Sequence, residues 1–274
     1  MQTKCSDERP DPIPCSDERP DPIPRDPIHW TPFPALTPIP APMKDLTLFP
    51  VPLLPDLNTP PRASGLAIQL ARKSIGCNRC FEQLPLSHAG ISLPQPFAVA
   101  RNYRRGGVAI IGINPGASTD GGYKEKRKHA LDCFASGKDA ALEEYWDALA
   151  TDAEQSWNPR YLARLRSLKL DLDSLFTGNI ALCATAENRY PKKLLRNCWE
   201  LHTASVLKAY APGVVVFMGS EGVIGEFVRS SQNLLPESSI VRMAHYAHRK
   251  GKAYEAQECA RVMQVIRCAL QHAT

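Results

Sequence analysis

The sequence predicts a three-layer α/β/α protein with a central, mostly parallel four-stranded sheet and a disordered, Pro-rich N-terminal tail. Three observations support this prediction. Four short apolar runs rich in β-branched residues have the composition of buried parallel strands. Segments with helical spacing alternate with these runs, which is the pattern of a doubly wound sheet. The chain has 274 residues, 43% of them hydrophobic, and this is enough for one good-sized core.

Residues 1–62 are expected to form a tail outside the folded domain, which spans residues 63–274. Most of the 25 prolines lie in the tail, and so many prolines cannot support a helix or a central strand. The decapeptide Cys5–Pro14 recurs unchanged at Cys15–Pro24, and a partial third copy begins at Arg25. A recent duplication, or translated upstream sequence with Met43 as the true start, would also explain the repeat. We assign the tail no catalytic role.

The folded domain is expected to begin with a helix and then to alternate strands and helices. The predicted strands are Val108–Ile111, Asn179–Cys183, Val214–Met218 and Ile240–Met243. The predicted helices are Ala63–Lys73, Lys124–Phe134, Ala140–Leu149, Pro159–Leu168, Pro191–Ala209, Val223–Ser230 and Glu255–His272. Phe176–Gly178 is predicted to be a turn, so that Asn179 begins its strand.

Parallel sheets of this kind bind ligands at the carboxyl ends of their strands. We therefore expect Asn114, the region around Cys183, Gly219 and His245 to lie along one edge of the sheet.

The sequence contains two clusters of basic residues, although the net charge is only +5. Residues 101–128 hold seven of them, and residues 242–252 hold four without an acidic residue. Basic clusters that flank a ligand-binding edge suit a polyanionic substrate. The alternative for either cluster alone is a solubilising surface. No apolar run approaches the roughly 20 residues of a membrane span, and no signal-peptide pattern begins the chain. We expect a soluble, cytoplasmic protein.

The loop Gly112–Gly116, with the sequence Gly-Ile-Asn-Pro-Gly, follows the first predicted strand directly. Two glycines and a proline impose a sharp turn that holds one amide side chain, Asn114, at the edge of the sheet. An asparagine cannot act as a base, but it can orient a water molecule. We predict that this loop belongs to the active site of an enzyme. The alternative is an ordinary turn after a strand.

Four of the nine cysteines form two pairs. Cys77 and Cys80 are separated by two residues, and Cys183 and Cys198 by fourteen. Two such pairs can close one four-thiolate site for an iron–sulfur cluster or for zinc. The alternative is that Cys183 and Cys198 are small buried side chains of the core. Cys133, Cys259 and Cys268 are expected to be core residues.

The order of these motifs resembles the uracil-DNA glycosylase superfamily. Gly-Ile-Asn-Pro-Gly is followed by Asn179-x3-Cys183, by Asn188-Arg189-x-Pro191, by an apolar strand that ends in Gly219, and by a strand followed by His245. The cysteine pattern resembles the iron–sulfur branch, family four, whereas the first loop resembles the mismatch-specific uracil/thymine glycosylases. The resemblance covers about residues 74–270.

The resemblance implies an enzyme of base excision repair that flips uracil, or a related deaminated base, out of DNA and hydrolyses its N-glycosidic bond. Asn114 and His245 match the catalytic positions: the asparagine orients the attacking water, and the histidine donates to uracil O2. Asn179 matches the residue that reads the uracil edge. Gly112, Ile113 and Gly116 would line the base, and Tyr123, with Phe134 as second choice, would stack on it.

The resemblance also implies a [4Fe–4S] cluster held by Cys77, Cys80, Cys183 and Cys198, with zinc as the alternative. This sequence departs from the family at Tyr246-Ala247, where the family usually has Pro-Ser, so the phosphate contact that the serine makes in the family is missing. Arg249 or Lys250 is expected to contact DNA instead. We expect a monomer whose partner is uracil-containing DNA. The two alternatives are a DNA- or damage-binding protein of the same fold with weak or lost catalysis, and a metal-stapled nucleotide hydrolase.

Overall fold

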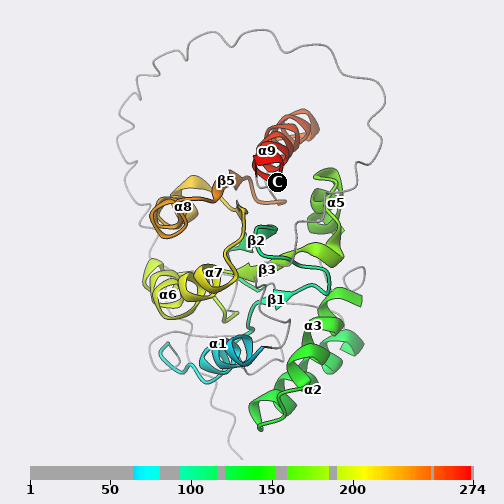
Figure 1. The fold of residues 1–274 in the computed structure, drawn as a ribbon, viewed down its shortest axis with the longest axis vertical. Helices are drawn as coiled ribbons and strands as arrows, with labels where there is room; N and C mark the ends of the chain where they lie inside the picture. Colours follow the sequence, from blue (N-terminus) through cyan, green and yellow to red (C-terminus); the bar gives the residue numbers. More distant parts are fainter. Residues whose placement is uncertain are drawn as a thin grey trace, which may run out of the picture. The chain divides into compact units, whose positions relative to one another are not determined.

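The computed structural model describes residues 64–80, 93–115, 121–151, 159–184, 190–247 and 250–272. The predicted tail, residues 1–62, lies outside these ranges. The described part of the chain is a mixed α/β fold built on a mostly parallel sheet (Figure 1). No helix within these ranges is both long enough and apolar enough to cross a membrane.

The sheet has five strands in the described residues, in the order β1-β3-β2-β4-β5. They are β1 (Ala98–Val99), β2 (Val108–Gly112), β3 (Phe176–Asn179), β4 (Val214–Met218) and β5 (Ser239–Met243). β1 pairs antiparallel with β3, and all the other pairings are parallel. The mostly parallel α/β class is confirmed. The predicted number of four strands is wrong, because the two-residue edge strand β1 is too short to show a periodic pattern.

The predicted position of the second strand is also wrong. Phe176–Gly178 is not a turn: it forms the body of β3, and Asn179 is the last residue of that strand rather than the first. Phe176, Thr177 and Gly178 pair with Ala109, Ile110 and Ile111 of β2. Pairing with a buried neighbouring strand outweighs the local turn preference of glycine. Asn179 therefore lies at the carboxyl end of its strand.

The helices largely follow the predicted pattern. Their bounds are α1 (Gly65–Ile75), α2 (Gly121–Ala135), α3 (Ala141–Thr151), α5 (Pro159–Ser167), α6 (Lys192–Cys198), α7 (Ala204–Tyr210), α8 (Glu221–Leu234) and α9 (Lys252–His272). A 3₁₀ turn, η1 (Leu172–Ser174), precedes β3. The helix predicted over residues 191–209 is interrupted by a π-helical turn, η3 (Trp199–Thr203), between α6 and α7.

Alternation along the strands divides the apolar side chains between two clusters. Ala109, Ile111 and Phe217 belong to a cluster that includes residues of α1, α2, α3, α6, α7 and α8. Val108, Ile110 and Val216 belong to the other, with residues of α5 and α9. Successive side chains of a strand point to opposite faces, so each face of the sheet carries its own apolar cluster. The two clusters hold the strand ends in place, and with them the loops that follow.

Candidate active site

The four parallel strands end at one edge of the sheet, and their last residues are linked through the backbone. The Ile180 N–H donates to the Gly112 carbonyl and the Ala181 N–H to the Ile113 carbonyl, both at 2.9 Å. At the other end of the row, the Gly219 N–H donates to the Met243 carbonyl, also at 2.9 Å. The segments that follow β2, β3, β4 and β5 were predicted to lie along one edge of the sheet. These four strands are parallel and hydrogen-bonded to one another (Figure 1).

The side chain of Asn179 lies directly beside Gly112. These two residues are register partners at the ends of β3 and β2. A β-carbon built at Gly112 would lie 2.5 Å from Asn179 Oδ1, so the amide could not keep this position beside a larger residue. The Thr203 hydroxyl donates to the Asn179 carbonyl at 3.0 Å. The backbone at Asn179 is thus held both by a neighbouring strand and by the π-helical turn.

The first two residues after β2, Ile113 and Asn114, are half-buried. The Asn114 Nδ2 donates to the Pro115 carbonyl at 3.2 Å, which orients the amide within its own loop. Ile113 packs at the end of β4: a β-carbon built at Gly219 would lie 3.2 Å from Ile113 Cδ1. Gly116 lies outside the described residues.

His245 follows β5 by two residues and is half-buried. Its Nδ1 accepts the Ala247 N–H at 3.2 Å, so a neutral ring carries its proton on Nε2. The Tyr246 ring lies with its centroid 4.1 Å from that of the imidazole. The buried Glu258 of α9 accepts the Ala244 N–H at 2.9 Å, one residue before the histidine. This carboxylate holds the start of the histidine loop against α9.

Of the two basic residues predicted to contact DNA, only Lys250 belongs to the described part of the chain. Lys250 is exposed, and its Nζ lies 4.6 Å from the centroid of the Tyr254 ring. Arg249 lies outside the described residues. This cation–π contact holds the ammonium group of Lys250 against α9. Lys250 follows His245 closely in the sequence.

The four predicted metal-binding cysteines interact electrostatically in the fold. Cys80, Cys183 and Cys198 are buried, and Cys77 is half-buried. Burial raises the pKa of the Cys183 thiol to about 12, with smaller contributions in the same direction from Cys198, Cys77 and Cys80. Burial likewise raises the pKa of Cys198 to about 11. Four thiols that influence one another in an apolar surrounding are a donor set that suits a soft or borderline metal.

The arrangement of these thiols falls short of a closed site. Within the described residues, no group of three or more His, Cys, Asp or Glu side chains has the geometry to hold a metal ion. Of the other cysteines, Cys259 is buried as expected and Cys133 is half-buried. Cys268 is exposed on α9, so its prediction as a core residue is wrong. The buried residues of α9, Cys259, Val262 and Ile266, follow helical spacing, and Cys268 falls on the opposite side of the helix.

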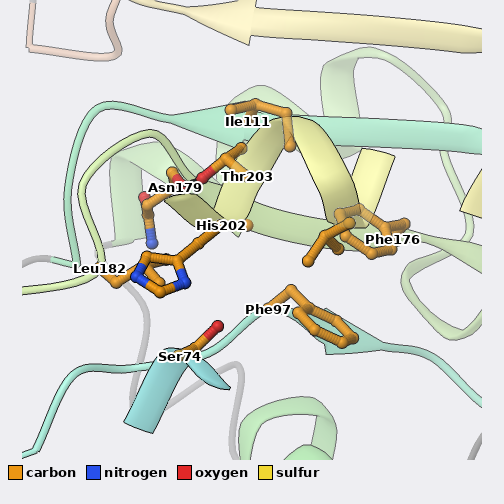
Figure 2. Close-up of a pocket in the computed structure, with 10 residues that line it drawn as sticks. Ser74, Phe97, Ile111, Phe176, Asn179, Leu182, His202 and Thr203 are labelled. Carbon is orange, nitrogen blue, oxygen red and sulfur yellow. Dashed lines mark hydrogen bonds between the residues drawn. The ribbon is translucent and has the colours of Figure 1, made fainter. Parts of the chain in front are cut away.

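An apolar pocket lies beside Asn179, beneath the ends of β2 and β3 (Figure 2). Its free volume is about 10 Å³, close to the space of a single water molecule. It is lined by Ser74, Phe97, Ile111, Phe176, Gly178, Asn179, Leu182, His202, Thr203 and Val206. The pocket therefore combines largely apolar walls with an amide and an imidazole.

The aromatic walls of this pocket differ from the predicted stacking residues. Phe97 and Phe176 line it, with ring centroids 5.7 Å apart and ring planes 16° from parallel. Phe134 is fully buried in the core beneath the Arg72 guanidinium, which lies 4.6 Å from its ring centroid, and it does not line this pocket. Tyr123 belongs to α2, and its side chain lies outside the described part of the structure.

Sequence reasoning missed His202, which lines the pocket from η3 (Figure 2). Burial, together with the nearby charge of Lys73, lowers the pKa of this imidazole to about 4. One signal was present: His202 stands four residues after Cys198, so helical spacing puts both on one face. Glu258 was also missed, because a glutamate in an amphipathic helix gives no sign that its carboxylate is buried.

No known protein-family model matches this chain, and no curated protein matches it.

Proposed function

We propose that this protein is a DNA glycosylase of the uracil-DNA glycosylase type, which flips uracil or a related deaminated base from DNA and hydrolyses its N-glycosidic bond. The observation that carries the proposal is the Asn179 amide, held against Gly112 at the end of β3 and facing an apolar pocket. An amide at such a place can pair with both N3–H and O4 of uracil, which cytosine does not present together. Flipping costs a few kcal/mol, which stacking and edge hydrogen bonds offset.

The two catalytic roles belong to Asn114 and His245. The glycosidic bond breaks through an oxocarbenium-like sugar, and the departing uracil carries the negative charge. A neutral His245 with its proton on Nε2 can donate to uracil O2 and stabilise that charge, and the hydrogen bond that Nδ1 accepts from Ala247 favours this tautomer. Asn114 is proposed to orient the attacking water, in the loop that its bond to Pro115 stiffens.

A [4Fe–4S] cluster held by Cys77, Cys80, Cys183 and Cys198 is part of the proposal, with zinc as the alternative. Its support is the chemistry of four mutually interacting, largely buried thiols. Such a cluster would tie the segment after α1 to the segment after β3 rather than take part in the reaction. The three-layer α/β/α arrangement belongs to the same proposal and is supported by the separate apolar clusters on the two faces of the sheet. We also propose that the protein is a cytoplasmic monomer that acts on DNA.

The proposal is tested by a glycosylase assay on oligonucleotides that contain a single uracil, hypoxanthine, xanthine or mismatched thymine. The wild-type chain is compared with Asn114→Ala, His245→Ala and Asn179→Ala, and with Glu237→Ala as an exposed control. We expect cleavage of at least one substrate, with losses of about 10²- to 10³-fold in each of the three site variants and none in the control. Inactivity of the wild type on all four substrates would refute the proposal.

A catalytically weak or inactive DNA-binding protein is the second candidate. Two observations favour it: the pocket has free space for only about one water, and Tyr246 stands where the family has proline. DNA binding that persists in Asn114→Ala without turnover in the wild type would identify this second function. The metal-stapled nucleotide hydrolase has no such support here.

A further inference from the structure

His202 is a buried histidine of the described part of the chain, and its ring nitrogens have no hydrogen-bond partner there. Its side chain is only 4% exposed. Among the described residues, neither Nδ1 nor Nε2 has a hydrogen-bond partner. A buried polar group without a partner is costly and rare in folded proteins. Such a group is commonly retained because a ligand or an ordered water satisfies it.

The position of His202 points to a ligand rather than to the interior of the core. It lines the same pocket as Asn179, and Figure 2 shows the imidazole and the Asn179 amide on the same side of that pocket. The other polar side chains of the pocket already have acceptors. The Ser74 hydroxyl donates to the Leu70 carbonyl at 2.9 Å, and the Thr203 hydroxyl donates to the Asn179 carbonyl at 3.0 Å.

The local backbone explains how the ring reaches this place. His202 belongs to the π-helical turn η3, which separates α6 from α7. A π turn inside an α-helix is uncommon and occurs frequently at functional sites. Thr203, the next residue, ties the turn to the end of β3 through Asn179 and Ile180. Whatever positions the Asn179 backbone therefore also positions His202.

We propose that His202 is a base-recognition residue, whose imidazole hydrogen-bonds the heterocyclic base that Asn179 holds. This inference rests on the proposed glycosylase function and adds a specificity residue to it. A neutral imidazole offers one N–H donor and one acceptor, whereas a leucine-sized apolar side chain offers neither. A site built to hydrogen-bond its substrate discriminates strongly against bases that lack the matching group. His202 thus contributes to the choice among damaged bases rather than to bond cleavage itself.

The test compares His202→Leu and His202→Asn with the wild type on oligonucleotides containing uracil, hypoxanthine or xanthine. Leucine removes both ring nitrogens, and asparagine retains a donor and an acceptor. Tyr210→Phe is the matched control, because it removes a buried hydroxyl that has no partner in the described residues and does not line the pocket. We expect His202→Leu to lower kcat/KM on the preferred base by about tenfold or more and to change the ratio of kcat/KM between bases. His202→Asn should recover part of the loss. The control should change neither kcat/KM nor this ratio.

A second readout is independent of catalysis. Free uracil and free hypoxanthine are titrated into the full chain, and the ¹⁵N signals of the His202 imidazole are followed, assigned by their loss in His202→Asn. We expect these signals to shift with at least one base. Equal losses on all bases with a lowered Tm, or unchanged kinetics together with unshifted signals, would overturn the inference. Shifted signals in a wild type without glycosylase activity would support base contact by His202 while refuting the proposed function.

Discussion

The side-chain oxygen of Asn179 lies in the space beside Gly112 that a side chain would need, because a β-carbon at position 112 would stand 2.5 Å from Oδ1. The two residues are paired at the ends of adjacent parallel strands. The glycine at the start of the Gly-Ile-Asn-Pro-Gly loop therefore has a definite task, which is to leave room for the amide proposed to read the base. This relationship connects the first loop to β3.

Replacing Gly112 with alanine should displace the Asn179 side chain. The added methyl group cannot fit without a shift, and a displacement of about 1 Å at a positioned group can cost about 100-fold in rate. We expect kcat/KM on the preferred base to fall by about this factor, measured by oligonucleotide cleavage. Gly222→Ala is the control, because a β-carbon there meets nothing within 4 Å. Equal activity in Gly112→Ala and wild type would contradict the role given to Asn179.

Removing the Glu258 carboxylate should loosen the histidine loop. Glu258→Ala leaves the Ala244 N–H without its 2.9 Å acceptor, and a buried donor without an acceptor costs about 1–3 kcal/mol. We expect the free energy of unfolding, measured in urea, to fall by that amount. We also expect the folded fraction of the variant to have a lower glycosylase activity than the folded wild type. Exposed Glu237→Ala should stay within about 0.5 kcal/mol of wild type. A Glu258→Ala protein as stable as this control would show that the buried bond is unimportant.

The cysteines make a prediction about colour and metal. Protein purified without oxygen should be brown, with absorbance near ~400 nm from an iron–sulfur cluster. Cys183→Ser should abolish that absorbance, and Cys268→Ser should leave it unchanged, because Cys268 is exposed and outside the proposed set. Colourless protein that contains one zinc per chain would favour the alternative metal. Metal-free wild type with normal stability would remove the site from the proposal.

Acidification should destabilise the fold through His202. Burial lowers the pKa of this imidazole from 6.5 to about 4, so the unfolded chain binds more protons than the folded one between these values. The free energy of unfolding should therefore decrease as pH falls from about 6.5 to about 4, by at most about 1.4 kcal/mol per pH unit. Urea titrations at several pH values, on wild type and His202→Asn, measure this slope. We expect a shallower slope in the variant, and identical slopes would contradict it.

The fold could be predicted from the sequence where patterns are local and long. The runs at Val108–Gly112 and Val214–Met218 are apolar throughout, which is what burial on both faces requires, and both are strands. β3 was misplaced because Thr177-Gly178 favours a turn locally, and its pairing with β2 is a long-range interaction. The sequence does not predict β1, because a strand of two residues is too short to show an alternating pattern of apolar and polar side chains.

The sequence by itself determined the α/β class, the alternation of helices and strands, and the loops that follow β2, β4 and β5, because these depend on hydrophobic periodicity and on Gly and Pro in turns. Only the tertiary structure decided that Asn179 ends its strand beside Gly112, that Glu258 holds the backbone before His245, and that His202 faces the pocket. The physical reason is that strand register, burial of a carboxylate and a π-helical turn are set by contacts between residues far apart in the chain. No local pattern of residues encodes those contacts.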